Sequence, residues 1–557
     1  MAFHRLALLF LGLLVFPYLS LSADHGAVAT VHELATDSAL DTLRRGGNAV
    51  DATVAAALTL GVVDGHNSGI GGGCFLLIRR ANGEVVAIDG REMAPAAASK
   101  DMFLRNGQAD PKLSQTGALA VGVPGSVAAY EYAVKHFGKL DWKSVILPAA
   151  GIAEHGFVLG RSYAGRLASM GDEMKAFPAT RAIFLDKAGR PWKSSDLLRQ
   201  PDLASSYKAL ADQGSEWFYK GPFAVATAAW MKSNGGLLTE SDFRNYQIKL
   251  RQPLRTTYRG YEIIGFPPPS SGGVHVAEIL NILELFDLKR MGLNSADFIH
   301  VVTEAMKLAF ADRAHWLGDP DFVPVPRGLI SKDYAAAMAQ RIQMDRAKPV
   351  PSHSIPANAT SDTFGKHTTH LAVSDSDGNW VACTATINTT FGSKVVVPGS
   401  GVVLNNQMDD FSAQPGVANF FGLVGTEANA IAPGKRPLSS MSPTIVLKDG
   451  KPILSVGAAG GPTIISQTLL AIIARVDFGL APEAALAQAR FHHQWLPDEL
   501  RIEKAVPAAV QNELRKRGHK LNVMDSLGAC QVIGWNEKIR TFEAAHDPRV
   551  NGKAGTF

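Results

Sequence analysis

Residues 348–374 read KPVPSHSIPANATSDTFGKHTTHLAVS, and this stretch decides how the two halves of the chain are joined. From Lys348 to Lys366 it is rich in Pro, Ser, Ala, Asn and Thr and has no apolar period, which predicts an exposed, flexible connection. After His367, Thr368 opens the first strand predicted for the second half. An irregular leader that ends at such a threonine favours a chain that is cut there.

A cut before Thr368 would give the hydroxyl of this residue a base. A threonine hydroxyl is a weak nucleophile and needs a base. If the bond between His367 and Thr368 were broken, the new α-amine of Thr368, with an intrinsic pKa of about 7.7–8.0, could be that base. Threonine is also a favoured strand residue, so this residue alone leaves an ordinary structural role open.

Outward from this stretch, hairpin signals recur in both halves. In the first half, β-prone runs flank Asn82-Gly83, and in the second half they flank Asp377-Gly378, Asp449-Gly450 and Asn536-Glu537. Helices are predicted over residues 32–45, 52–62, 463–475, 482–491 and 508–517, and the middle third (140–342) reads as mostly helical with polar faces. Hairpins mixed with buried helices predict an α+β protein in which helices cover antiparallel sheets.

Composition limits the class of protein. The chain has 557 residues, 46% of them hydrophobic and 19% charged, and a formal net charge of +4. At about 150 residues per domain this length allows three or four domains, with ample material for a large core. No basic tract is longer than Arg515-Lys516-Arg517, which argues against a nucleic-acid partner.

The N-terminus predicts export. His4-Arg5 precede an apolar run from Leu6 to Phe16 and the small residues around Ser22, which is the pattern of a signal peptide over residues 1–22. The run is too short to cross a bilayer, which takes about 20 apolar residues, and no later segment qualifies. We expect an exported protein with no membrane span after signal removal.

The cysteines predict neither a disulfide framework nor a metal site. Cys74, Cys383 and Cys530 are odd in number, and no Cys or His spacing matches a zinc site. We therefore expect three small buried hydrophobes, no metal and no cofactor.

Five short motifs then follow one another along the chain. They are Arg91-Glu-Met-Ala-Pro95, Asn388-Thr-Thr-Phe-Gly392, Asn405-Asn-Gln-Met-Asp-Asp-Phe411, Lys435-Arg-Pro-Leu-Ser-Ser-Met-Ser-Pro-Thr444 and Gly457-Ala-Ala-Gly-Gly461. With Thr368-Thr-His370, the set closely resembles the γ-glutamyltranspeptidases of the N-terminal-nucleophile hydrolase superfamily. The resemblance covers essentially the whole mature chain.

This resemblance implies a fold and a maturation step. The fold would be a four-layer αββα sandwich, with two stacked antiparallel sheets covered by helices. A precursor would cut itself between His367 and Thr368 into a large subunit (residues 23–367, ending in the linker 348–367) and a small catalytic subunit (residues 368–557), which stay together as a heterodimer. The location would be the periplasm in a Gram-negative organism, or otherwise the outside of the cell.

The resemblance also implies the activity and the roles of single residues. The enzyme would transfer the γ-glutamyl group of glutathione and related donors, through a threonine ester, to water, amino acids or peptides. Thr368 would be the nucleophile, Thr386 would orient its amine, and Gly460 and Gly461 would form the oxyanion hole. Arg91, Ser439 and Ser440 would bind the donor's α-carboxylate, and Asn388, Gln407 and Asp410 its α-ammonium group.

Two other functions stay open at this point. An acylase of the same superfamily, acting on glutaryl side chains of cephalosporin type, would have no need of the ammonium-binding residues. An exported amino-acid-binding protein would not need a threonine after a cleavable linker.

One departure from the family pattern concerns a lid over residues 415–422. Many bacterial relatives have a tyrosine that bonds the pocket asparagine where this chain has Phe421. We therefore expect a lid held more by packing than by hydrogen bonding.

Overall fold

The computed structural model describes residues 25–359, 361–364 and 372–557. The predicted signal peptide, His367 and Thr368 lie outside the described residues.

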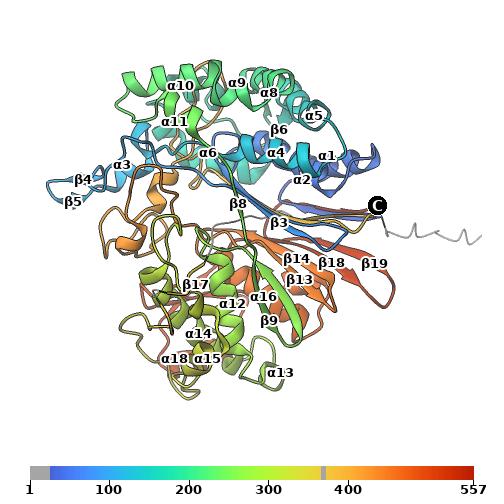
Figure 1. The fold of residues 1–557 in the computed structure, drawn as a ribbon, viewed down its shortest axis with the longest axis vertical. Helices are drawn as coiled ribbons and strands as arrows, with labels where there is room; N and C mark the ends of the chain where they lie inside the picture. Colours follow the sequence, from blue (N-terminus) through green and yellow to red (C-terminus); the bar gives the residue numbers. More distant parts are fainter. Residues whose placement is uncertain (1–24, 360, 365–371) are drawn as a thin grey trace, which may run out of the picture.

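Two antiparallel sheets form the centre of the described structure (Figure 1). The seven-stranded sheet has the order β20 (Lys553–Thr556), β1 (Gly26–Thr30), β11 (Ala372–Asp375), β12 (Trp380–Thr386), β2 (Gly73–Arg79), β3 (Val85–Gly90) and β8 (Lys249–Arg251). The six-stranded sheet has the order β19 (Thr541–His546), β18 (Ala529–Asn536), β14 (Lys451–Ala459), β13 (Thr444–Lys448), β10 (Tyr261–Gly265) and β9 (Leu254–Tyr258).

Successive side chains of β2 point into two different cores, one on each face of the first sheet. Cys74, Leu76 and Ile78 belong to the core that includes the helices above the sheet. Phe75 and Leu77 belong to the core shared with the second sheet, and Phe75 stacks on Phe266 with ring centroids 5.0 Å apart. Because successive side chains of a strand point to opposite faces, a continuous apolar run is what a doubly covered strand requires.

Helices form the two outer layers (Figure 1). Above the first sheet lie α1 (Glu33–Arg44), α2 (Ala49–Val63), α4 (Ser126–Phe137), α5 (Trp142–His155), α6 (Arg161–Met174), α8 (Pro201–Gln213) and α10 (Pro222–Ser233). Below the second sheet lie α12 (Gly272–Leu283), α14 (Ala296–Trp316), α15 (Lys332–Ala339), α16 (Thr463–Val476) and α18 (Ala508–Lys516).

The two sheets mix strands from both sides of residue 368. β1 pairs with β11 and with β20, and β10 pairs with β13, all antiparallel. The predicted α+β sandwich is therefore confirmed. The described residues therefore form one sandwich to which both halves of the chain contribute strands, rather than three or four independent domains.

The middle third is mostly helical, as predicted, and it also contains the strands β8, β9 and β10; the turn between β9 and β10 uses Arg259 and Gly260 at positive φ (53° and 80°). Two local predictions are wrong. In the same third, every residue of α12 is buried, so this helix has no polar face. The helix predicted over 482–491 ends early, because α17 spans Pro482–Leu486 and Phe491–His492 form strand β15.

The connection before residue 365 is exposed in part, as predicted, but it is fastened to the protein. The Trp495 Nε1 donates to the Val350 carbonyl (2.7 Å), and the Ser354 N–H donates to the Asp312 carboxylate (2.6 Å). Thr363 forms a β-bridge with Pro326. Composition could not predict that this connection is fastened, because the partners in these contacts lie far away in the sequence.

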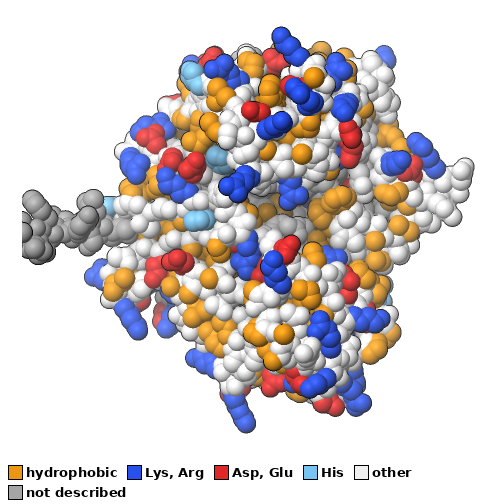
Figure 2. Space-filling model, turned by 180° about the vertical axis from the view of Figure 1, so that it is seen from behind, with side chains coloured by type: hydrophobic (Ala, Val, Ile, Leu, Met, Phe, Trp, Pro, Cys, Tyr) orange, Lys and Arg blue, Asp and Glu red, His pale blue; other side chains and the backbone are white. Residues whose placement is uncertain are grey.

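The remaining general predictions concern the cysteines, the membrane and the surface. Cys74, Cys383 and Cys530 are buried free thiols, as predicted. Among the helices of the described residues, none is both long enough and apolar enough to cross a membrane. The face in Figure 2 carries side chains of both charges interspersed, without a basic stripe, and is hollowed near its centre.

Candidate active site

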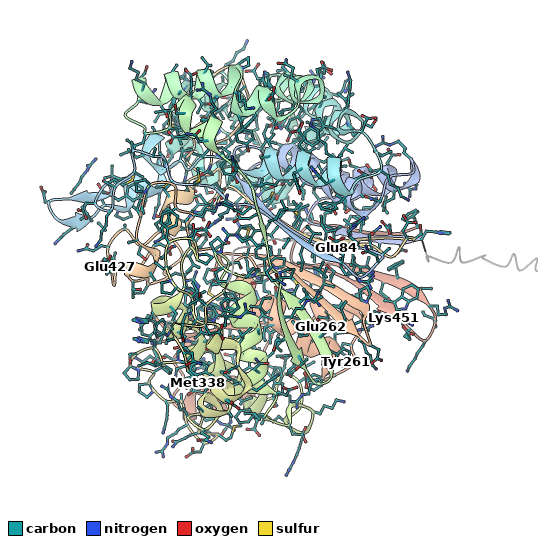
Figure 3. All side chains as sticks on the ribbon, viewed as in Figure 1. Glu84, Tyr261, Glu262, Met338, Glu427 and Lys451 are labelled. Atoms are coloured by element: carbon teal, nitrogen blue, oxygen red, sulfur yellow. The ribbon has the colours of Figure 1, made fainter. Side chains whose placement is uncertain are left out.

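The long connection between β12 and β13 (residues 387–443) brings half of the predicted site residues to one end of the sandwich. Figure 3 shows Glu427 of this connection at the end opposite to Glu84 and Lys451, which lie at hairpin turns. Arg91 joins the connection because it directly follows β3. The site is therefore built from both halves of the chain.

Arg91 is fully buried, and most of its guanidinium group is engaged. Its Nε donates to the Pro437 carbonyl (3.1 Å), and its Nη2 donates to the Leu438 carbonyl (3.3 Å) and to the Asp410 carboxylate (2.5 Å). The Nη1 has no hydrogen-bond partner among the described residues. A buried charged donor without a partner is costly, so this atom is suited to an incoming anion.

Asp410 and Gln407 lie together in the short 3-10 helix η3 (Gln407–Asp410). The Gln407 Nε2 donates to the same Asp410 oxygen that Arg91 contacts, at 3.0 Å. The Gln407 Oε1 is buried and has no hydrogen-bond partner within the described part of the chain. One small region thus offers an unpaired donor on Arg91, an unpaired acceptor on Gln407 and the negative charge of Asp410.

Ser439 and Ser440 connect this region to a second buried arginine. Arg313 of α14 donates from Nη2 to the Ser440 Oγ (3.1 Å) and from Nε to the Ser271 Oγ (2.9 Å). The Ser439 Oγ accepts the Met441 N–H at 3.1 Å, which stabilises the turn. Burial lowers the pKa of Arg313 to about 10, and the negative charge of Asp410 partly offsets this effect.

Sequence reasoning missed Arg313. It lines a small cavity of about 10 Å³ together with Asp410 and Asn429. In the sequence it is one charge near the end of a long helical pattern, with nothing that distinguishes it from a solvent-exposed residue.

Asn388 and Thr386 form a tight turn at the end of β12. Asn388 has φ 78°, and its N–H donates to the Thr386 Oγ at 2.8 Å. The Asn388 Nδ2 donates to the Asn406 carbonyl at 3.0 Å, which ties this turn to the segment just before η3. A hydroxyl that accepts one hydrogen bond can still donate its proton, so Thr386 can serve a further partner.

Gly460 and Gly461 connect β14 to α16 with φ values of 133° and 58°. A Cβ on Gly461 would lie 2.5 Å from the Phe421 Cδ1, and a Cβ on Gly460 would lie 2.6 Å from the Thr463 Oγ. Only glycine fits both the backbone and the space. Backbone N–H groups at a helix N-terminus can also stabilise a developing negative charge.

A cavity of about 490 Å³ lies beside Gly460. Its lining includes Thr384 and Ala385 of β12, Ala458 of β14, Gly460, and Ala372 at the start of β11. Ala372 is the first described residue after Thr368. The predicted nucleophile itself lies outside the described residues.

The lid prediction needs correction. The Phe421 ring covers Gly461, which is packing, but hydrogen bonds hold the segment as well. The Phe420 N–H donates to the Asp409 carboxylate (3.0 Å), and the Gln494 Nε2 donates to the carbonyls of Phe421 (3.2 Å) and Gly422 (3.0 Å). The prediction that packing holds the lid more than hydrogen bonding was therefore wrong, because backbone groups of the lid make hydrogen bonds that the Phe421 side chain cannot make.

Glu92 adds a titratable group beside Arg91. It is fully buried, and one of its oxygens lies 3.6 Å from the Arg91 Nη1. Burial raises the pKa of Glu92 to about 7, although the charge of Arg91 opposes the shift. A buried carboxyl with such a pKa beside Arg91 is a candidate for control of ligand binding.

Comparisons with known proteins identify the family of this chain. The γ-glutamyltranspeptidase family model matches residues 35–557. The glutathione hydrolase proenzyme of Escherichia coli is 46% identical over 514 residues, which cover 92% of this chain and 88% of the relative.

Solved structures add two neighbours. The cephalosporin acylase of Bacillus halodurans superimposes with a TM-score of 0.85 at 28% identity and covers 99% of each chain. The γ-glutamyltranspeptidase of Helicobacter pylori has a TM-score of 0.57 at 40% identity, over 58% of this chain and 94% of its own.

Proposed function

Because this chain belongs to the γ-glutamyltranspeptidase family, we infer that it is a γ-glutamyl hydrolase and transferase that acts on glutathione and related γ-glutamyl amides. The acceptors that we propose are water, amino acids and peptides. The observation that carries the proposal is the pair of unpartnered atoms beside Asp410, one a donor and one an acceptor.

A γ-glutamyl donor has both an α-carboxylate and an α-ammonium group, and the pocket offers a match for each. In the free protein Arg91 and Asp410 neutralise each other. A bound donor would replace the ion pair between Arg91 and Asp410 by two, with its carboxylate on Arg91 and its ammonium on Asp410. The Arg91 Nη1 and the Gln407 Oε1 would then gain the partners that they lack.

The remaining pocket residues have supporting roles in this proposal. Ser439 and Ser440 complete the carboxylate side, where Arg313 orients the Ser440 hydroxyl. Asn388 completes the ammonium side with its side-chain oxygen, because its Nδ2 is held by the Asn406 carbonyl.

The proposed reaction uses Thr368 as the nucleophile. Its Oγ attacks the γ-carbonyl carbon while its α-amine, which Thr386 orients, takes the hydroxyl proton. The N–H groups of Gly460 and Gly461 stabilise the oxyanion. The C–N bond then breaks, the departing amine receives the proton, and a γ-glutamyl ester of Thr368 remains. Water or an acceptor amine attacks this ester and restores Thr368.

We propose that the chain is made as a precursor and cuts itself between His367 and Thr368. The products would be residues 23–367 and 368–557, and the interleaved strands of both sheets would hold them together. The name of the E. coli relative, a proenzyme, supports such a step. Removal of residues 1–22 during export to the periplasm, or out of the cell, is part of the same proposal.

A cephalosporin-type acylase is the alternative function, because an acylase shares the fold. A glutaryl group lacks the α-ammonium group, so an acylase would leave the Gln407 Oε1 and Asp410 without their ligand. The ion pair and the unpaired acceptor therefore favour the γ-glutamyl donor.

The experiment is release of a chromogenic amine from its γ-glutamyl amide, with and without a dipeptide acceptor. The matched control is the glutaryl amide of the same amine. We expect fast release from the γ-glutamyl amide and acceleration by the dipeptide. Faster release from the glutaryl amide would support the acylase instead.

A further inference from the structure

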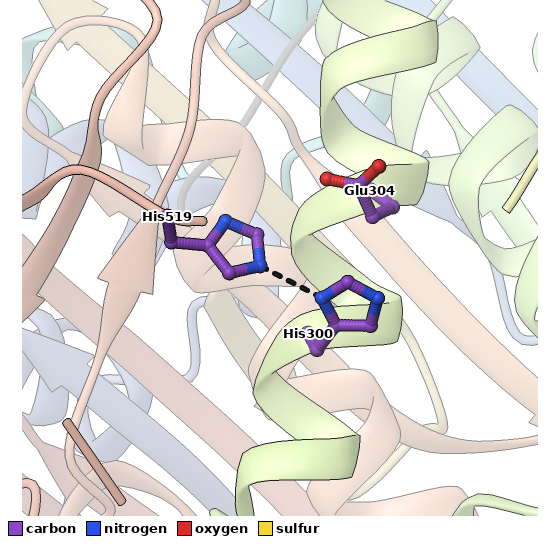
Figure 4. Close-up of side chains that lie close together, drawn as sticks. All are labelled: His300, Glu304 and His519. Carbon is purple, nitrogen blue, oxygen red and sulfur yellow. Dashed lines mark hydrogen bonds between the residues drawn. The ribbon is translucent and has the colours of Figure 1, made fainter. Parts of the chain in front are cut away.

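A cluster of metal-binding side chains lies outside the active site, at the side of α14 that faces α18. His300 and Glu304 are one helical turn apart on α14, and His519 comes from the loop between α18 and β17 (Leu521–Met524) (Figure 4). One ligand atom of each residue lies within 4.8 Å of the others. All three residues are buried, with at most 6% of their surface exposed.

The hydrogen bonds of His300 show which of its two ring nitrogens holds the proton. The Nε2 is 2.7 Å from the Gln343 carbonyl, an acceptor, so this nitrogen holds the proton. The Nδ1 therefore keeps its lone pair and accepts a hydrogen bond from the His519 Nε2–H at 2.8 Å, so zinc binding requires the proton of His519 to move to its Nδ1. A backbone carbonyl that fixes the far nitrogen of a histidine is the usual support of a metal ligand.

His300 and His519 each contribute one ring nitrogen to the cluster. A third histidine nearby, His493, is occupied by contacts with Asp498 and with the Trp495 N–H.

Glu304 is oriented by its neighbours but is not saturated. One carboxylate oxygen accepts from the Lys307 ammonium (2.9 Å) and the other from the Lys348 N–H (3.0 Å). A carboxylate has about four acceptor positions, so two remain. The Lys307 charge opposes a cation here, and the nearby carboxylate of Asp498, 3.9 Å from Lys307, reduces that opposition.

We propose that this cluster is a zinc site, with His300 Nδ1, His519 Nε2 and a Glu304 oxygen as protein ligands. Two imidazoles and one carboxylate are a donor set that Zn²⁺ accepts, and water would complete the tetrahedron. Tetrahedral ligands of zinc are about 3.3 Å apart, so the two rings need to separate slightly from 2.8 Å. The segment beside the cluster contacts it through the Gln343 carbonyl and the Lys348 N–H, and residues 345, 346, 348 and 349 of this segment are exposed.

The location gives the metal a structural consequence. His300 and Glu304 belong to residues 23–367 and His519 to residues 368–557, so the ion would bridge the two chains if the proposed cleavage occurs. The same cluster holds Gln343 and Lys348, at the start of the connection that leads to residue 367. Zinc binding itself does not depend on the cleavage or on the γ-glutamyl activity.

The test is zinc retention by the purified, untagged protein. Wild type is loaded with zinc, desalted and analysed for metal. We expect about one zinc per chain pair in wild type and in His155→Ala, whose imidazole is exposed and outside the cluster. In His300→Ala and His519→Ala, retention is expected to fall by at least about tenfold. No zinc in wild type, equal retention in the cluster variants, or loss in His155→Ala would each overturn the proposal.

Two measurements keep the test decisive if a variant fails to fold. Co²⁺ in wild type is expected to give the intense visible absorption of a four-coordinate ion, and a weak six-coordinate spectrum would contradict the site. The same titration of the uncut Thr368→Ala precursor needs neither cleavage nor activity. Zinc bound there without turnover would separate a failure of the proposed function from a failure of this inference.

Discussion

Replacement of Arg91 by lysine is the sharpest probe of how the pocket recognises its donor. Lysine keeps the positive charge but cannot reproduce the planar fork of the guanidinium group. In the structure Arg91 contacts Pro437, Leu438 and Asp410, and its Nη1 has no hydrogen-bond partner among the described residues. The ammonium group of the substituted lysine could reach Asp410 or the donor's carboxylate, but not both.

The size of the effect follows from that loss. A charge-assisted hydrogen bond contributes about 1.5–3 kcal/mol. Since about 1.4 kcal/mol corresponds to a tenfold change, KM for a γ-glutamyl amide should rise about 10- to 150-fold in Arg91→Lys. The kcat should change much less, because Arg91 contacts the α-carboxylate and not the reacting carbonyl.

The assay uses two amides of the same chromogenic amine. One is the γ-glutamyl amide, and the other is the 4-aminobutyryl amide, which has the ammonium group but no carboxylate. Arg91→Lys should raise KM for the first and leave the second nearly unchanged. Arg259→Lys is the matched control, because Arg259 also holds backbone carbonyls and a carboxylate, Asp477, but in the β9–β10 turn.

Two results would refute the reasoning. An unchanged KM for the γ-glutamyl amide would remove Arg91 from the pocket. An equal loss on both amides, or the same loss in Arg259→Lys, would mean that the substitution disturbs the fold rather than carboxylate binding.

Three further predictions concern Glu92, Gly461 and Phe421. Because burial raises the pKa of Glu92 to about 7, this carboxyl gains its charge as the pH rises through neutrality and then competes with the donor's carboxylate for Arg91. The KM of wild type should therefore rise from about pH 6 to about pH 8 while that of Glu92→Gln stays flat; parallel profiles would contradict this. Gly461→Ala should lose about 1–3 kcal/mol of stability through its clash with Phe421. In thermal unfolding that loss should exceed the loss in Gly450→Ala, where φ is also positive (75°) but no atom lies within 4 Å of the new Cβ; equal losses would exclude the clash. Phe421→Tyr adds a hydroxyl to the lid and should change the ratio of hydrolysis to transfer; an unchanged ratio would dismiss this role for the lid.

The hairpins and the site motifs could be predicted because their information is local. Gly83, Gly378 and Gly450 all have positive φ, and each lies in a turn signal next to β-prone runs. Arg91, Gln407 and Asp410 could be grouped because they belong to recognisable motifs. The fold then brings Arg91 and Gln407 into contact with Asp410.

Other features could not be predicted because they depend on distant partners. Arg313 resembles any charge on a long helix until Ser271 and Ser440 are placed beside it. The connection before residue 365 looks flexible by composition, yet Trp495 and Asp312 fasten it. His300 and His519 have no meaningful spacing in the sequence, and only the packing of α14 beside the α18–β17 loop brings them together.

The central claim is that Thr368 is both the site of self-cleavage and the nucleophile. The most direct measurement is the intact mass of purified wild type and Thr368→Ala. Wild type should give two chains, the smaller one spanning residues 368–557 and beginning with Thr368. Thr368→Ala should give one uncut chain that releases no amine from a γ-glutamyl amide. A Thr368→Ala protein that matures into two chains, or that keeps its activity, would contradict the account.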